Sequence, residues 1–145
     1  MKILIVAHPD DEVLWFNPED YDKIYIVFCA RDDKPGMGLQ RFRAIKEHPL
    51  DVECFYLKES GYHKDKRLKK EYELSRDELI TKLKELKDIT KVTTHDAQGE
   101  YGHLDHRLVH DTCMEVFDCK VNGKNPKMYR KIKKLYQKNL CWTWD

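Results

Sequence analysis

Short apolar runs recur along the chain with helical segments between them, and this alternation limits the folds that are available. The apolar runs cover residues 2–7, 23–30, 52–57 and 89–95. The first run, KILIVA, is continuously apolar, as expected of a strand that is covered on both faces. Residues with helical spacing follow at 38–48, 66–87, 104–117 and 127–138. Strands that alternate with helices predict an α/β fold with a mainly parallel sheet and helices on both of its faces.

The remaining C-terminal residues are interpreted as a loop at 122–126 and a last strand at 140–144. The sequence shows no repeat, low-complexity segment or linker, so residues 1–145 are expected to form a single domain. A net charge of +1 with 37% charged residues excludes a strongly basic nucleic-acid binder. Five cysteines, an odd number without a CxxC pair, argue for a reducing cytosol and against a disulfide framework or a zinc knuckle. No apolar stretch approaches the roughly 20 residues of a membrane span, so a cytoplasmic protein is expected.

Residues that carry chemistry follow three of the expected strands. The sequence AHPDDE (7–12) ends the first strand, Arg31 to Asp33 follow the second, and His95 to His106 follow the fourth. In open α/β sheets, ligands bind at the carboxyl ends of the strands. A histidine beside three carboxylates is stable where a cation binds or where protons are transferred. The sequence therefore predicts a functional site at this edge of the sheet.

A second cluster, GEYGHLDHRLVH, covers residues 99–110. His103 and His106 lie three residues apart, so they share one face at the start of a helix. Together with the first motif they supply two histidines and several carboxylates, and catalytic zinc usually takes three N or O ligands of this kind. Iron(II) suits such a site equally well. One of the adjacent aspartates can bind the metal while the other takes a proton from water, but the spacing does not decide between them. The histidines without a pairing signal are His48, His63 and His95.

The motifs AHPDDE and THDAQGEYGHLDH (94–106), in this order, resemble those of the PIG-L (LmbE-like) family of zinc-dependent N-deacetylases. The close similarity covers about twenty residues, whereas the general order of elements covers most of the chain. Members of that family have a Rossmann-like α/β fold and remove acetyl groups from N-acetylglucosamine-type sugars. The resemblance therefore implies a compact Rossmann-like enzyme of the same class.

The resemblance also assigns roles to individual residues. It implies that His8, Asp11 and His106 bind zinc, with iron(II) as the alternative metal. Asp10 matches the general base that takes a proton from the attacking water. His103 matches the histidine that polarises the acyl oxygen or protonates the leaving amine. The resemblance thus decides which aspartate is the metal ligand.

Other positions depart from the family pattern or match it loosely. Asp105 is placed to orient a histidine. An arginine near the next helix contacts the sugar in relatives, and Arg41 and Arg43 both fit this position, with Arg31 as a further candidate. The residues after the first motif, 13–22, are bulky, so a curtailed first helix is expected.

The sequence thus predicts a hydrolase that removes an N-acetyl group from an N-acetylglucosamine-type sugar or its conjugate. One alternative is a metal-dependent hydrolase of another amide or of a phosphoester. A second is a non-catalytic module that binds anionic glycans or nucleic acid through residues 119–144, which contain eight Lys and Arg residues and no acid. We favour a solvated helix face for this segment and expect no stable nucleic-acid partner. The same segment could instead hold an anionic substrate.

Overall fold

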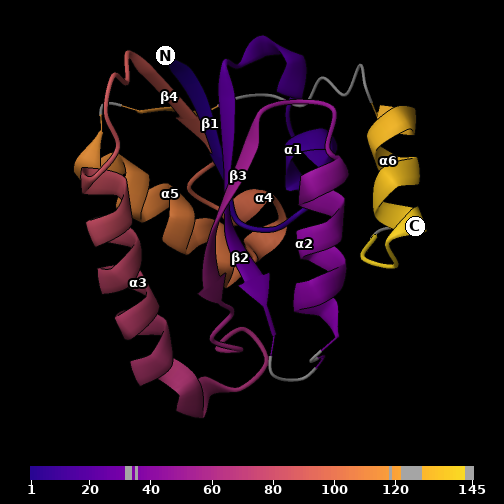
Figure 1. Ribbon diagram of the computed structural model, residues 1–145. Helices are drawn as coiled ribbons and strands as arrows, with labels where there is room; N and C mark the ends of the chain where they lie inside the picture. Colours follow the sequence, from indigo (N-terminus) through magenta and orange to yellow (C-terminus); the bar gives the residue numbers. More distant parts are fainter. Residues whose placement is uncertain (32–33, 35, 118, 122–128, 143–145) are drawn as a thin grey trace.

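The computed structural model describes residues 1–31, 34, 36–117, 119–121 and 129–142, and the strands within them form one parallel sheet (Figure 1). The strand order is β3-β2-β1-β4-β5, and each neighbouring pair is parallel. The strands are β1 (Lys2–Val6), β2 (Lys23–Ala30), β3 (Val52–Lys58), β4 (Lys91–Thr94) and β5 (Cys119–Val121). The predicted α/β class with a mainly parallel sheet is confirmed.

Helices cover both faces of this sheet, as predicted. Figure 1 shows α3 and α5 on one side of the sheet and α2 and α6 on the other. The helices are α1 (Asp11–Leu14), α2 (Met37–Glu47), α3 (Lys69–Lys84), α4 (Gly99–Gly102), α5 (Leu104–Val116) and α6 (Tyr129–Lys138). Two 3-10 turns, η1 (Pro18–Asp20) and η2 (Lys66–Leu68), lie before β2 and α3.

The buried strand β1 divides the core into two parts because its side chains alternate between the two faces. Ile3 and Ile5 pack in a cluster with Leu79 and Leu83 of α3 and with residues of α5. Leu4 and Val6 point the other way, into a cluster that includes Ile45 of α2. The sheet therefore holds β1 between two helical layers, and its carboxyl end is fixed from both sides.

Two expectations about the ends of elements can be compared with the structure. The curtailed first helix is confirmed, since α1 has four residues and Pro18 begins a 3-10 turn soon afterwards. The strand β5 was not predicted. Residues 140–142, part of the expected last strand, form no strand, whereas 143–144 and the expected loop at 122–126 lie outside the described residues.

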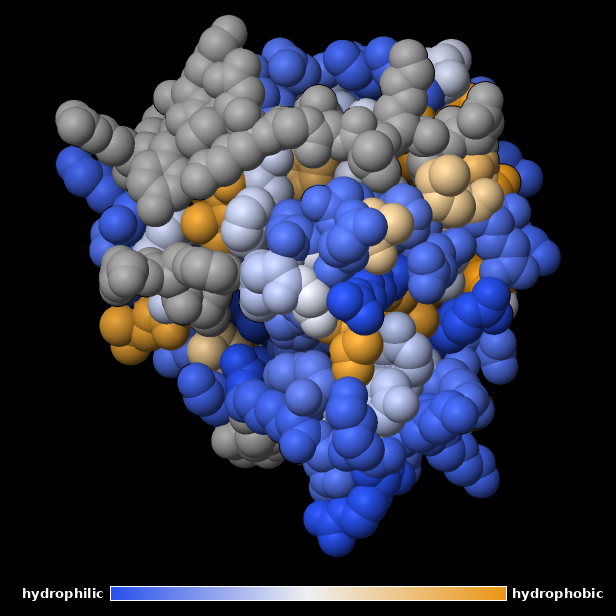
Figure 2. All heavy atoms as spheres, turned by 180° about the vertical axis from the view of Figure 1, so that it is seen from behind, coloured by the Kyte–Doolittle hydropathy of each residue, from blue (hydrophilic) through white to orange (hydrophobic). Residues whose placement is uncertain are grey.

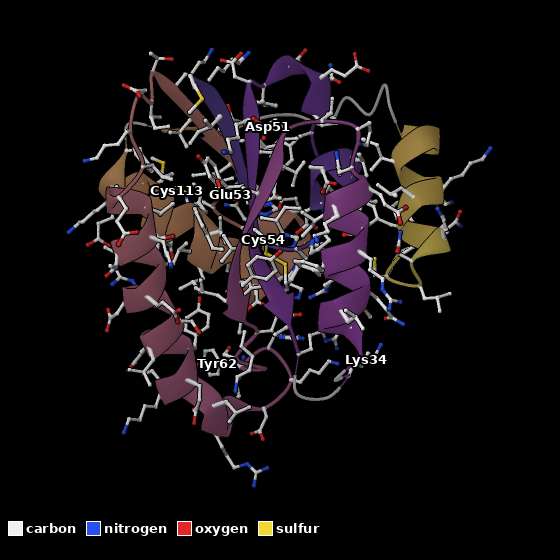
Figure 3. All side chains as sticks on the ribbon, in the orientation of Figure 1. Lys34, Asp51, Glu53, Cys54, Tyr62 and Cys113 are labelled. Atoms are coloured by element: carbon white, nitrogen blue, oxygen red, sulfur yellow. A yellow bond between two sulfur atoms is a disulfide. The ribbon has the colours of Figure 1, made fainter. Side chains whose placement is uncertain are left out.

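A disulfide joins Cys29 of β2 to Cys54 of β3, and Cys54 is labelled in Figure 3. The expectation that the cysteines remain reduced is wrong for this pair. The two residues are 25 positions apart, and the parallel pairing of β2 with β3 brings them together. Cys113 and Cys141 are buried and do not belong to this disulfide.

The molecular surface is mostly polar on the face seen in Figure 2, where hydrophobic residues are scattered among hydrophilic ones. Exposed large hydrophobic side chains among the described residues include Leu39, Leu74 and Met114, which lie on different helices. Within the described part of the chain, none of the helices has the length and apolarity needed to cross a membrane.

Candidate metal centre and active site

A cavity of about 590 Å³ opens where the carboxyl ends of the strands meet. Four successive strands supply residues to its wall, because parallel strands end at the same edge of a sheet. Those residues are His8, Asp10 and Asp11 after β1, Arg31 after β2, Glu59 after β3, and His103 after β4. Lys34 and Tyr62, labelled in Figure 3, come from loops at this edge. The structure thus brings the two sequence motifs together at the predicted place.

The three residues expected to bind a metal lie around one point. Oδ2 of Asp11 is 3.2 Å from Nδ1 of His8 and 3.2 Å from Nε2 of His106. All three donor atoms lie within 4.8 Å of one another, and the three side chains are buried. The loop between β1 and α1 sets this arrangement, because the backbone N–H of His8 donates to Oδ2 of Asp11 at 2.8 Å.

These separations fit a small tetrahedral cation. Two ligands that bind zinc at about 2.0–2.1 Å lie about 3.3–3.4 Å apart at the edge of a tetrahedron. Nε2 of His106 is buried and, although Oδ2 of Asp11 lies 3.2 Å away, it makes no hydrogen bond of acceptable geometry with the described residues, which is costly for a polar atom unless it binds a ligand. The donor set of two imidazoles and one carboxylate also suits zinc or iron(II). The residues present therefore fit the metal that the sequence predicts.

Carboxylates hold the opposite nitrogens of both histidines. Nε2 of His8 lies 3.0 Å from Oδ2 of Asp105, and Nδ1 of His106 lies 3.0 Å from Oε1 of Glu100. Asp105 was expected to orient a histidine, and the histidine that its side chain contacts is His8. A carboxylate on one ring nitrogen fixes the tautomer and directs the other nitrogen toward a metal. Each histidine therefore presents one defined nitrogen to the central point.

Glu100 had no predicted role, although it lies inside the second motif. Its φ of 63° is in the left-handed region, so the backbone turns sharply between β4 and α5. Gly99 permits the turn, since a Cβ there would lie 3.2 Å from Cβ of His106 and 3.1 Å from Cγ of Arg107. The turn brings the Glu100 carboxylate to both His106 and His95.

His95 was expected to have no special role, but it is fully buried beside the candidate site. Its Nε2 accepts the backbone N–H of Ala7 at 3.0 Å, so its Nδ1 carries the proton and donates to Glu100. Its ring stacks on His106, with ring centroids 4.1 Å apart. His95 therefore packs against the ring of His106, and both of its own nitrogens form hydrogen bonds.

His103 lies at the start of α5, where a side chain can cap the helix. Its Nδ1 accepts the backbone N–H of Asp105 at 3.1 Å. This bond leaves the proton of the neutral ring on Nε2. Burial and the neighbouring His8 lower the pKa of His103 to about 3. At neutral pH, His103 is thus an uncharged hydrogen-bond donor on the cavity wall.

Asp10 lies in the cavity wall together with His8 and Asp11, and it is almost fully buried. Its backbone has a φ of 96°, an unusual value for a residue with a side chain. The backbone N–H of Asp10 donates to Oε2 of Glu12 at 3.0 Å. Asp10 thus shares the cavity wall with His8 and Asp11, and its role as a general base stays a prediction.

The arginines suggested for substrate binding differ in position. Arg41 is only 2% exposed, lines the cavity and donates from Nη1 to Oε2 of Glu59 at 2.7 Å. Its Nε has no hydrogen-bond partner among the residues that the structure describes. Nε of Arg31 lies 3.7 Å from the same carboxylate oxygen, and Arg31 also lines the cavity. Arg43 is exposed on α2 and is absent from the cavity wall formed by the described residues. Glu59 therefore joins two of the arginines to His8, from which it is 3.2 Å away.

His8 and His106 lie in a strongly anionic environment. Burial alone lowers the pKa of His106, but the carboxylates of Asp11 and Glu100 outweigh burial and raise this pKa to about 9. Burial likewise opposes charge on His8, yet Glu59, Asp105 and Asp11 raise its pKa well above the usual value. A site with these properties attracts positive charge, either as protons or as a cation.

Comparisons with known proteins find a similar fold but no related sequence. No family model matches the chain, and no curated protein matches it in sequence. Among solved structures, the chain is similar to the crystal structure of Dbv21, described as the antimicrobial reagent A40926 pseudoaglycone deacetylase, with a TM-score of 0.56. The two chains are 15% identical, and the match covers 97% of this chain and 81% of that one. At this identity the similarity concerns the fold.

Proposed function

We propose that the chain is a metal-dependent hydrolase that removes an N-acetyl group from an N-acetylglucosamine-type sugar or its conjugate, with residues 1–145 acting as one catalytic domain. The observation that carries this proposal is the convergence of His8, Asp11 and His106 on one point, beside Asp10 and His103 in a common cavity. Membership of the PIG-L family, suggested by the two motifs, is part of the proposal. The similarity in fold to a protein described as a deacetylase supports it.

His8, Asp11 and His106 would hold the metal, and zinc is the first choice with iron(II) as the alternative. The bound metal would supply a Lewis acid that polarises the amide carbonyl and lowers the pKa of water to about 7. Asp105 and Glu100 keep the two histidines oriented through their opposite ring nitrogens. Other side chains of the cavity would transfer the protons and stabilise the negative charge on the carbonyl oxygen.

Asp10 acts as the general base and takes a proton from the water that attacks the amide carbon. It can return this proton to the departing amine, since a single carboxylate can serve as base and then as acid. His103 donates its Nε2–H to the carbonyl oxygen as this oxygen becomes negative, a contribution worth about 10²–10³-fold in rate for one donor. Because its pKa is lowered to about 3, His103 acts as a neutral donor rather than as an imidazolium acid.

The charges of the cavity wall favour an amino-sugar substrate that carries an anionic group. The lining includes three carboxylates and four cationic groups, which are Asp10, Asp11 and Glu59 against Arg31, Lys34, Arg41 and Lys64. A cleft with an excess of cationic groups concentrates anionic ligands. This observation favours a sugar conjugate with a phosphate or carboxylate group, and it keeps a phosphoester hydrolase as the alternative activity.

The test combines metal analysis with an activity screen. The purified protein is expected to contain one equivalent of zinc or iron and to release acetate from N-acetylated amino sugars, faster from anionic conjugates than from neutral ones. Phosphate release from phosphoesters without acetate release would support the alternative. Acetate release that persists after complete removal of metal would refute the proposed mechanism.

A further inference from the structure

A buried hydrogen-bond cluster next to the candidate site connects three distant parts of the chain. Its centre is Glu12 of α1, whose side chain is fully buried. Oη of Tyr136, on α6, donates to Oε1 of Glu12. Nε2 of His48, at the end of α2, lies 3.1 Å from the same oxygen. Tyr136 is 124 residues away from Glu12 in sequence, so only the folded structure reveals this contact.

Each polar atom in the cluster has a defined role. Nδ1 of His48 accepts the backbone N–H of Leu50 at 3.1 Å, so the proton of the neutral ring lies on Nε2 and is donated to Glu12. Oε1 of Glu12 therefore accepts from Tyr136 and His48, while Oε2 accepts from the backbone N–H of Asp10 at 3.0 Å. A fully buried carboxylate requires such donors, because an unpaired buried charge strongly destabilises the folded state.

The last of these bonds reaches the proposed general base. Asp10 has a φ of 96°, and residues other than glycine adopt such a conformation only where the surroundings hold them. The bond from its N–H to Glu12 is one of the contacts that hold it. Since Tyr136 and His48 fix the Glu12 carboxylate, they also fix the oxygen that Asp10 contacts.

The helix α6 packs firmly enough to serve this purpose. Ile132 and Tyr136 are fully buried, in a cluster with Val13 of α1 and with Met37 and Ala44 of α2. Figure 1 shows α6 beside α2, away from the sheet. Leu140 and Trp142, which follow this helix, line the cavity of the candidate site.

We propose that Tyr136 is a positioning residue for catalysis: through Glu12, the C-terminal helix holds Asp10 in the backbone conformation that directs its carboxylate into the cavity. The proposal rests on the proposed function, because it assigns Asp10 the role of general base. It gives the C-terminal helix a part in the active site that neither sequence motif indicates. Displacement of α6 would thus lower the rate without removing the metal ligands.

The test compares Tyr136→Phe with a matched variant, Tyr25→Phe. Tyr25 is also a buried tyrosine, but it lies on β2 in the cluster on the α3 side of the sheet, stacked on Phe55. For Tyr136→Phe we expect kcat to fall about tenfold, with KM and metal content unchanged, because a small misplacement of a catalytic group is costly. We also expect the amide of Asp10, observed by NMR, to exchange its hydrogen about tenfold faster. Tyr25→Phe should change neither quantity.

A second variant keeps the test decisive if Tyr136→Phe folds poorly. In Glu12→Gln, the side-chain amide cannot accept from all three donors, so Asp10 exchange and kcat should change in the same direction. Unchanged kcat and unchanged Asp10 exchange in a folded variant would overturn the proposal, as would a fall in kcat explained entirely by loss of metal. If the unmodified protein proves inactive as a deacetylase, the proposed function fails, and the Asp10 exchange still decides whether α6 positions this residue.

Discussion

Replacing Glu100 by glutamine should weaken metal binding although Glu100 is not itself a proposed ligand. Oε1 of Glu100 lies 3.0 Å from Nδ1 of His106 and also accepts from His95, while Oε2 accepts the backbone N–H of Asp96 at 2.9 Å. Burial raises the pKa of Glu100, but the bonds to His106 and His95 outweigh burial and lower it to about 2. The carboxylate is thus ionised at neutral pH and holds the proton of His106 on Nδ1.

The size of the effect follows from these bonds. In Glu100→Gln the side chain has one accepting oxygen, and its NH2 group must face either a histidine N–H or the backbone N–H of Asp96. The charge-assisted bond to His106, worth about 1.5–3 kcal/mol, is lost or becomes a weaker neutral one. Loss of a carboxylate that orients a metal-binding histidine typically reduces affinity about 10–100-fold. This factor equals about 1.4–2.8 kcal/mol of binding free energy, in agreement with the cost of the bond.

Competition with a chromophoric zinc chelator measures the affinity directly, without any assumption about the substrate. A suitable control is Glu115→Gln, because Glu115 lies exposed on α5, where it pairs with Arg76. The control should bind metal like the unmodified chain. If Glu100→Gln is folded and binds zinc with the original affinity, the assignment of His106 Nε2 as a ligand oriented by Glu100 is refuted.

Four further results are expected. Asp10→Asn should retain one equivalent of metal and lose at least about 10²-fold in kcat, the usual contribution of a general base; a loss of metal in this variant would contradict the assignment. His106→Ala should lose both metal and activity, measured by metal analysis after dialysis. The pKa of His106 is raised to about 9, so chelator-treated protein should release protons when it binds zinc at pH 7. Calorimetry in two buffers counts these protons. The affinity for zinc should rise as the pH rises toward 9. Because of this raised pKa, the stability contributed by protonated His106 is complete below about pH 6.5 and is lost as the pH rises through 9. Chelator-treated protein should therefore melt at a lower temperature at pH 9.5 than at pH 6.5. An unchanged melting temperature would contradict this reasoning.

Much of the fold could be predicted because apolar runs and helical spacing are local signals. The continuously apolar sequence of β1, buried on both faces, indicated a central strand. The strand β5 (Cys119–Val121) was missed because three residues are too few for a periodic pattern. The Cys29–Cys54 disulfide was missed because strand pairing, rather than cysteine spacing, brings its two residues together.

The candidate site divides in the same way. The rule that ligands bind at the carboxyl ends of parallel strands indicated where Asp10, His103 and the three proposed metal ligands lie. Applied to the third strand as well, it would have included Glu59, which directly follows β3 and lies in the cavity wall. Glu100 could not be assigned in advance, because its contact with His106 depends on a left-handed backbone conformation. The bond between Tyr136 and Glu12 depends on the docking of α6, for which the sequence carries no local signal.

The fold accommodates the three adjacent carboxylates of the first motif because each has different partners. Glu12 has three hydrogen-bond partners, Tyr136, His48 and the backbone N–H of Asp10, which satisfy its carboxylate oxygens without a metal. Asp11 instead faces His8 and His106, and its pKa is held well below the usual range by them against the opposing effect of burial. Those two histidines can provide positive charge only as bound protons or by sharing a cation with Asp11. Since the same atoms serve either purpose, protons and metal must compete for them, and the pH dependence of metal binding follows directly from the arrangement of these side chains.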